Sequence, residues 1–168
     1  LSDEPHRLGA AQLAAARGAA QEAGVAVTGL HWLLLKPSGL SISSRDENIR
    51  RKTIDVMLAL IDQCAELGGR YLVHGSPQQR RVEAGDTRAA AMARAQESFA
   101  AVAERAEKAG VLYCIEPLSS DQTQLINTLE EAAAMVTAIG SRSVRTMLDC
   151  SSAGRIESAP LPALVDSW

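Results

Sequence analysis

Aromatic side chains are scarce in this sequence. Phe, Trp and Tyr together make up 3 % of its 168 residues. The 17 lysines and arginines are outnumbered by 20 aspartates and glutamates, which gives a net charge of −3. An acidic chain has no general attraction for a phosphate backbone, and few rings are present to stack on bases. We therefore expect no nucleic-acid partner, and we disfavour a DNA-cleaving enzyme.

Cysteine pairs and long apolar runs are missing as well. Cys64, Cys114 and Cys150 lie far apart, and no two of them form a CxxC pair. Such a set is typical of reduced thiols, and not of a disulfide framework or a zinc knuckle. The longest apolar stretch, residues 25–35, is shorter than the roughly 20 residues of a membrane span, and no export signal is visible. We expect a cytoplasmic protein with no membrane partner.

The sequence repeats one pattern four times: a helix, a short connection, and a β-rich run that ends in polar residues. We expect helices at about 5–24, 48–67, 87–110, 128–140 and 160–168. We expect strands at about 25–31, 70–74, 111–116 and 144–149. Glycines follow the apolar stripes of the helices, as is common at helix C-termini, and Thr128 to Glu131 has the sequence of a capping box. Alternating strands and helices predict right-handed crossovers and a parallel sheet covered by helices.

Two architectures fit this pattern, an open doubly wound sheet and a (β/α)8 barrel. No glycine-rich phosphate loop follows a predicted strand, which weakens the first. Polar residues end every predicted strand: His31, His74, Glu116 and Asp149. In a barrel these strand ends converge on one face, where active sites are built. We therefore predict an α/β fold of the parallel (β/α) TIM-barrel type.

The predicted barrel is incomplete. A whole barrel has about 250 residues, and the pattern supplies about four of its eight strands. We expect residues 1–168 to form a single partial (β/α)8-barrel domain that lacks the first strand and the last strands.

Glu116 and Asp149 are the clearest candidates for chemistry. Each is an acid at the C-terminal end of an otherwise apolar strand. A partly buried carboxylate is costly unless a cation or hydrogen bonds compensate its charge. Two carboxylates from successive strands lie near enough to share one hard divalent ion. Solvated loop acids, or a salt bridge to an arginine, are the alternatives that the pattern leaves open.

Several segments resemble a known family. They are Gly-Leu-His-Trp at 29–32, Val-His-Gly-Ser at 73–76, Ile-Glu-Pro-Leu at 115–118, Asn-Thr at 127–128 and Met-Leu-Asp at 147–149. Together they are similar to the sugar phosphate isomerase/epimerase group of the xylose-isomerase-like barrels. The resemblance runs from about residue 25 to residue 168, and its most specific part is the Glu-Pro-Leu…Asn-Thr segment followed by a strand-end Asp.

The resemblance implies a metal site and a reaction. Members of this family hold a divalent ion, commonly manganese or magnesium, with Glu, Asp, His and Glu from four strands. Glu116 matches the first ligand and Asp149 the second, and the other two belong to later strands that this sequence does not contain. The ion stabilises an enediolate while one glutamate removes the α-proton and another returns it. The implied function is a metal-dependent isomerase or epimerase acting on a sugar or related hydroxy-carbonyl compound. Glu116 is then a catalytic residue, and this chain alone is expected to be inactive.

Four further residues are candidates for substrate binding. His31 and His74 end the two strands before Glu116, and we expect both to open onto the same face. The alternatives are a pocket wall for His31 and a loop-capping role for His74. Relatives that act on free ketoses often carry Glu and His where this sequence has Gln122 and Ser152. Both replacements keep hydrogen-bonding ability, but they leave the substrate class open.

Other interpretations remain. An inosose-type dehydratase would use the same metal frame, because dehydration begins with the same proton abstraction. An endonuclease-type phosphodiesterase would also use the same arrangement of metal ligands. A non-catalytic truncated barrel, folded as a homo-oligomer, is the alternative from another class. Arg80 and Arg81 are adjacent arginines, which are usually solvated, although such a pair could hold a phosphate.

Overall fold

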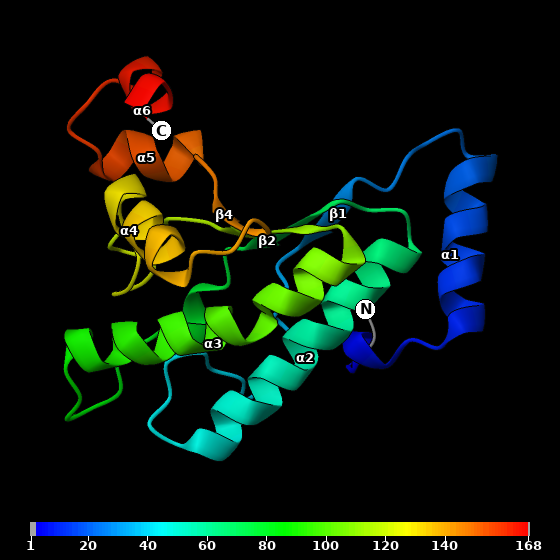
Figure 1. The fold of residues 1–168 in the computed structure, drawn as a ribbon, viewed down its shortest axis with the longest axis horizontal. Coiled ribbons are helices and arrows are strands. Elements are labelled where there is room, and N and C mark those ends of the chain that lie inside the picture. The colour runs from blue at the N-terminus through cyan, green and yellow to red at the C-terminus, as the bar shows by residue number, and fades with distance from the viewer. Residues whose placement is uncertain (1–2, 168) are drawn as a thin grey trace.

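A computed structural model describes residues 3–167 as a parallel sheet flanked by helices (Figure 1). The four strands occur in the order β1-β2-β3-β4, so each lies beside its neighbour in sequence. Their bounds are β1 (Gly29–His31), β2 (Tyr71–His74), β3 (Leu112–Ile115) and β4 (Val144–Thr146). All three pairings are parallel. The predicted α/β fold of the incomplete parallel barrel type is thereby confirmed.

The helices occupy most of the remaining sequence. They are α1 (Ala10–Glu22), α2 (Glu47–Glu66), α3 (Arg88–Ala109), α4 (Leu129–Ile139), α5 (Cys150–Ile156) and α6 (Leu161–Ser167), with short 3-10 turns η1 (Pro5–Arg7) and η2 (Pro77–Gln79). In Figure 1, α2 and α3 run side by side along one side of the sheet, α1 stands apart at one end, and α5 and α6 lie together at the other. No helix in residues 3–167 is both long and apolar enough to span a membrane.

The helix boundaries follow local chemistry closely. Gly110 and Gly140 end α3 and α4 with φ angles of 69°, the left-handed conformation that glycine adopts at low cost. Thr128 caps α4, because its hydroxyl accepts a hydrogen bond from the Glu131 amide at 3.2 Å. In a capping box the Glu131 side chain would accept a hydrogen bond from the Thr128 amide. Here its carboxylate accepts instead from the amide of the preceding residue, Asn127, at 2.8 Å.

Three predicted boundaries were wrong. The strand expected at 25–31 is reduced to Gly29–His31, the residues that are in parallel register with β2, and Val25 is 60 % exposed. The strand expected at 144–149 ends at Thr146, and helix α5, which the sequence pattern did not reveal, begins at Cys150. The first predicted helix is divided into η1 and α1, with Gly9 as the N-cap of α1.

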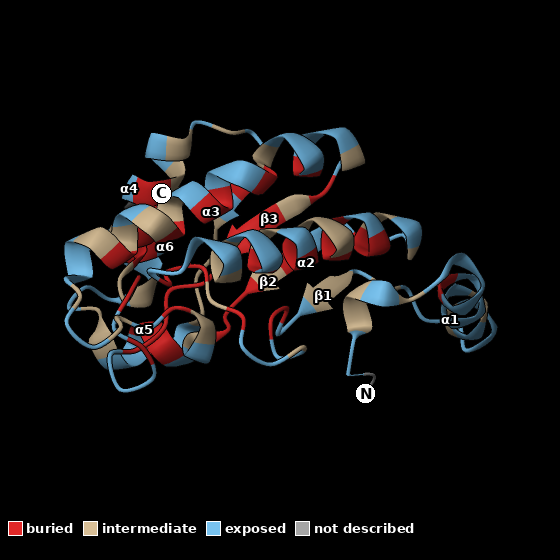
Figure 2. Ribbon diagram, turned by 90° about the horizontal axis from the view of Figure 1, so that it is seen from below, coloured by how far each residue is buried: buried red, intermediate tan, exposed pale blue. Residues whose placement is uncertain are grey.

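One face of the sheet packs against α2 and α3. The parallel register aligns Leu30, Leu72, Tyr113 and Val144 in a single row. Leu30 is partly buried and the other three are fully buried, in the same core as Phe99 of α3. Figure 2 shows the buried residues of α2 and α3 on the sides turned toward the sheet, whereas α1 is mostly exposed. Each fully buried aliphatic side chain of this kind contributes roughly 1.5–3 kcal/mol.

The opposite face of the sheet is more open. Side chains alternate along a strand, so the row containing His31, Val73, Cys114 and Arg145 points away from the helices. His31 and Arg145 are exposed, and Val73 is half-buried. In a closed barrel this face is the interior. The residues that follow the strands on this face are therefore those that can form a site at the C-terminal ends of the strands.

His74 does not lie on the open face. It follows Val73, which pairs with His31, so alternation turns His74 toward the helices. Its ring is fully buried and packs edge-on against Phe99, with ring centroids 4.9 Å apart. Its Nδ1 lies 2.8 Å from the hydroxyl oxygen of Tyr113. The prediction that His74 opens onto the same face as His31 was therefore wrong, and His74 is part of the core.

The buried position of His74 predicts a loss of stability in acid. Burial, assisted by the nearby Arg80 charge, lowers the pKa of His74 from 6.5 to about 3. Below pH 6.5 the unfolded chain takes up a proton that the folded chain refuses, so stability falls as the pH falls from 6.5 toward 3. Between pH 7 and pH 5 the free energy of unfolding should fall by about 2 kcal/mol through this group.

Urea unfolding of the wild type and of His74→Gln at several pH values measures this effect. The variant should lose most of the pH dependence over this range while keeping a polar partner for Tyr113. An unchanged slope in His74→Gln would show that other groups cause the acid sensitivity.

Candidate active site

Glu116 stands directly after β3 on the open side of the sheet. It lies two residues beyond Cys114 of the open-face row, and its backbone amide donates to the His74 carbonyl at 3.2 Å. Only 8 % of the residue is exposed. Its Oε2 lies 3.6 Å from Nε2 of His31, which comes from the end of β1. The structure thus brings together two of the predicted site residues, His31 and Glu116.

Gly75 leaves the space that the Glu116 carboxylate occupies. A Cβ atom added at Gly75 would overlap Oε2 of Glu116 and would stand 3.7 Å from Nε2 of His31. Any side chain at this position would push the carboxylate away from His31. A glycine directly after β2 is a sequence signal that another group approaches the backbone closely. The sequence does not show that this group is the Glu116 carboxylate.

The charge of Glu116 is influenced from several sides. Burial is the largest influence, and it raises the pKa of Glu116. The charge of His31 acts in the opposite direction, Asp149 raises the pKa further by repulsion, and Arg80 lowers it. Glu116 and Asp149 follow the adjacent parallel strands β3 and β4 at the same edge of the sheet.

Asp149 has a structural role that the sequence analysis missed. It is the N-cap of α5: one carboxylate oxygen accepts from the Ser151 amide at 3.1 Å, and the other accepts from the Ser152 amide at 3.0 Å. Hydrogen bonding from Ser152 is the main cause of the lowered pKa of Asp149. Asp is a preferred N-cap residue, so the Asp-Cys-Ser-Ser sequence could have predicted this helix. Both oxygens keep lone pairs for another partner.

The two remaining predicted residues lie in different settings. Ser152 is buried in the first turn of α5, where it supports Asp149. Gln122 is exposed in the turn after β3 and lines a hollow of about 210 Å³ with Arg81 and Asp121. The structure describes no contact between Gln122 and Glu116 within residues 3–167.

Asn127 explains the shape of the loop that carries Gln122. Its side-chain amide donates to the carbonyl oxygens of Leu118 at 2.8 Å and of Thr123 at 3.0 Å. These two bonds close the loop that follows Glu116. The Asn-Thr segment is therefore a structural clamp, with Thr128 capping the next helix.

Comparison with known proteins places the chain in a family. Residues 2–158 match the family model described as the xylose isomerase-like TIM barrel. The chain belongs to the xylose isomerase-like TIM barrel family. A probable ketose 3-epimerase of Synechocystis sp. is 27 % identical to it over 123 residues, which cover 67 % of this chain and 40 % of that protein.

Solved structures share the fold. D-psicose 3-epimerase of Clostridium cellulolyticum H10, crystallised with D-tagatose, superposes with a TM-score of 0.80 at 24 % identity, over 94 % of this chain and 54 % of that one. The 3-keto-D-glucoside 4-epimerase of E. coli gives a TM-score of 0.81 at 18 % identity, over 98 % and 62 %. The chain thus spans about half the length of the relatives that it matches.

The carboxylates of this barrel-family chain are suited to a hard divalent ion. Glu116 and Asp149 offer oxygen ligands, which manganese and magnesium prefer. Within residues 3–167, however, no group of three His, Cys, Asp or Glu side chains converges as a metal site would require.

Gly75→Ala should displace Glu116 without unfolding the chain. The methyl group would collide with the end of a flexible side chain, which can rotate away. We expect a stability loss of about 1–3 kcal/mol and a crystal structure in which Glu116 no longer approaches His31. Gly18→Ala is the matched control, since its Cβ would meet nothing within 4 Å, and it should not destabilise α1. A Gly75→Ala structure that keeps the 3.6 Å contact between His31 and Glu116 would contradict this explanation.

Proposed function

We propose that this chain is the site-bearing part of a divalent-metal-dependent sugar epimerase or isomerase, of the kind that moves a proton next to a ketose carbonyl. The observation that carries this proposal is the Glu116 carboxylate, which lies in the space that Gly75 leaves at the end of β3, while Asp149 follows the adjacent strand β4. The similarity to a probable ketose 3-epimerase and to D-psicose 3-epimerase supports a ketose as the class of substrate.

Glu116 is the proposed acid/base group. A carboxylate that exchanges a carbon-bound proton works best when its pKa lies above the usual range, and burial shifts the Glu116 pKa in this direction. Glu116 would take a proton from the carbon beside the carbonyl, or return one to it. His31, 3.6 Å away, orients the carboxylate from the side of β1.

Glu116 and Asp149 are also the proposed metal ligands from this chain. A bound manganese or magnesium ion would supply positive charge that stabilises the anion formed during proton transfer. Asp149 is well prepared for this role, because its hydrogen bonds from α5 fix both carboxylate oxygens. Ser152 would support the metal site indirectly, because its backbone amide donates a hydrogen bond to Asp149.

We propose that the substrate binds at the open face of the sheet. His31 is exposed there and can bond a sugar hydroxyl as well as Glu116. Gln122 is available on the loop after β3 if that loop turns toward the substrate. We assign no substrate contact to His74, because it is fully buried behind the strands.

Proton exchange in deuterated water tests this function. A chain extended to the length of the relatives should incorporate deuterium beside the carbonyl of ketoses such as D-fructose or D-tagatose when Mn²⁺ is present. Glu116→Gln in that chain should lower the rate by at least about 100-fold. Glu97→Gln, an exposed glutamate of α3, is the matched control and should leave the rate unchanged.

The 168-residue chain alone should show no metal-dependent exchange. It supplies two carboxylates, and proton transfer requires a second group on the other side of the substrate as well. Exchange by this chain without extension, or full activity of Glu116→Gln in the extended chain, would refute the proposed roles.

A further inference from the structure

Trp32 is an exposed aromatic residue with a strained backbone. It directly follows β1, and 64 % of the residue is exposed. Its φ angle is 56°, in the left-handed region where a bulky side chain is uncommon and costs conformational energy. A large apolar ring that stays in solvent gains nothing for folding either. Two features that do not favour the folded state thus coincide at one residue beside the candidate active site.

Ile126 provides a comparison within the same chain. In the part of the chain that the structure describes, Trp32 and Ile126 are the only residues other than glycine with a positive φ angle. Ile126 has a φ angle of 59°, but its side chain is fully buried in the main core, which offsets the strain. Trp32 has no comparable burial, so packing does not explain its conformation.

The residues after Trp32 hold its backbone in place. The next two side chains are both buried in the main core. The Leu34 amide donates to the Ser76 hydroxyl oxygen at 3.2 Å in the protein interior. Ser76 directly follows Gly75, whose lack of a side chain makes room in the candidate active site. The turn that contains Trp32 is therefore bonded to the segment that shapes this site.

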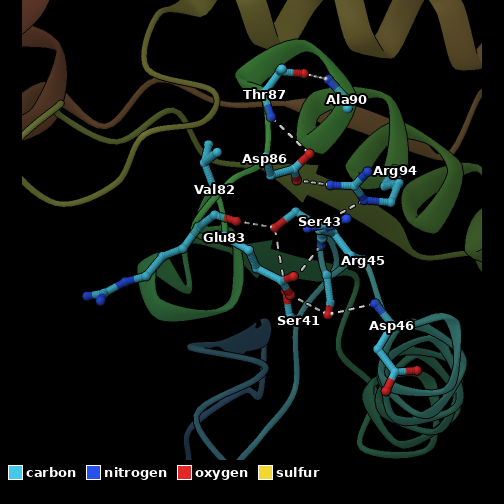
Figure 3. Close-up of polar contacts among 12 residues, drawn as sticks. Ser41, Ser43, Arg45, Asp46, Val82, Glu83, Asp86, Thr87, Ala90 and Arg94 are labelled. Atoms are coloured by element: carbon cyan, nitrogen blue, oxygen red, sulfur yellow. Dashed lines mark hydrogen bonds and ion pairs between the residues drawn. The ribbon is translucent and has the colours of Figure 1, made fainter.

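A polar network fixes the other end of the loop that follows β1. Figure 3 shows residues 41–46 bonded to residues 82–87. The Ser43 hydroxyl donates to the Arg81 carbonyl at 2.8 Å. The preceding Arg80 was expected to be solvated like Arg81, and its full burial shows that this expectation was wrong. Because the loop is anchored at both ends, the backbone after β1 is kept in the observed conformation.

The Trp32 side chain lies beside the polar pair of the candidate active site. Its ring and the ring of His31 have centroids 6.1 Å apart and are tilted by 52°. Nε2 of His31 lies in turn 3.6 Å from Oε2 of Glu116. Both rings line one hollow of about 350 Å³, a volume that suits a small molecule. The exposed indole is thus within reach of a molecule held by His31 and Glu116.

We propose that Trp32 is a substrate-binding residue, whose indole packs against one side of the sugar while His31 and Glu116 act on its polar groups. The face of an indole is apolar and electron-rich, so it suits the weakly positive C–H groups of a sugar. The strained turn holds the ring in place before the substrate arrives, which reduces the entropy lost on binding. The inference rests on the proposed function, because it takes the ligand to be the ketose on which Glu116 acts.

The stability of the 168-residue chain and of the extended chain gives the first test. Trp32→Gly removes both the exposed ring and the left-handed strain. The midpoint temperature of unfolding should stay the same or rise by up to about 3 °C. A fall of more than about 3 °C in either chain would show that the ring serves folding, and it would overturn the proposal.

The kinetics of the extended chain give the second test. With Mn²⁺ present, Trp32→Gly should raise KM for D-fructose or D-tagatose by about 5-fold to 50-fold and change kcat by less than about 3-fold, because the contact is made equally with substrate and transition state. Trp32→Phe keeps an apolar ring and should raise KM by less than about 3-fold. Tyr71→Leu removes an exposed aromatic ring at the opposite end of the sheet and should match the wild type. An unchanged KM in Trp32→Gly would overturn the proposal.

Equilibrium dialysis with labelled D-tagatose separates this inference from the proposed function. If the wild-type extended chain bound the sugar without exchanging its proton, the proposed function would fail. Weaker binding by Trp32→Gly would then still support Trp32 as a binding residue, and equal binding would overturn it. If the wild type bound no ketose at all, both proposals would fail.

Discussion

The parallel register of the four strands determines which side chains can reach the site. Successive side chains point to opposite faces, and the register brings Leu72, Tyr113 and Val144 into one row. Burial of this row against α2 and α3 fixes the orientation of the whole sheet, because a slip of one residue would expose the row. The alternate row must then face the open side. Glu116 and His31 lie there as a consequence of core packing.

The surroundings of Glu116 combine three kinds of contribution. Gly75 provides space, His31 provides a nearby polar partner, and burial raises the pKa of the carboxylate. Asp149 is held differently, by the backbone amides at the start of α5. The two carboxylates therefore come to the same end of the sheet through unrelated local devices.

Features that depend on local sequence could be predicted well. The helices α2, α3 and α4 were placed to within one or two residues, because apolar stripes and the left-handed glycines Gly110 and Gly140 mark them. The strand-end position of Glu116 was equally clear. The orientation of the side chains in β2 could not be predicted, since a strand of four residues does not show whether Val73 or His74 faces the core.

Features that depend on distant segments could not be predicted from the sequence. Arg80 is buried because the loops at 42–43 and at 123 close over its backbone, and nothing near it in sequence indicates this. The first strand is short because its parallel register with β2 covers only residues 29–31. The Asp149 cap was a local signal, but the expectation of a longer strand obscured it.

Whether Glu116 and Asp149 hold one metal ion can be seen directly by anomalous diffraction. Crystals of the extended chain grown with Mn²⁺ would be measured at an energy where manganese scatters anomalously. We predict a single peak within coordination distance of a carboxylate oxygen from each of Glu116 and Asp149. A peak bound to only one of these residues, or located elsewhere in the molecule, would contradict the shared site.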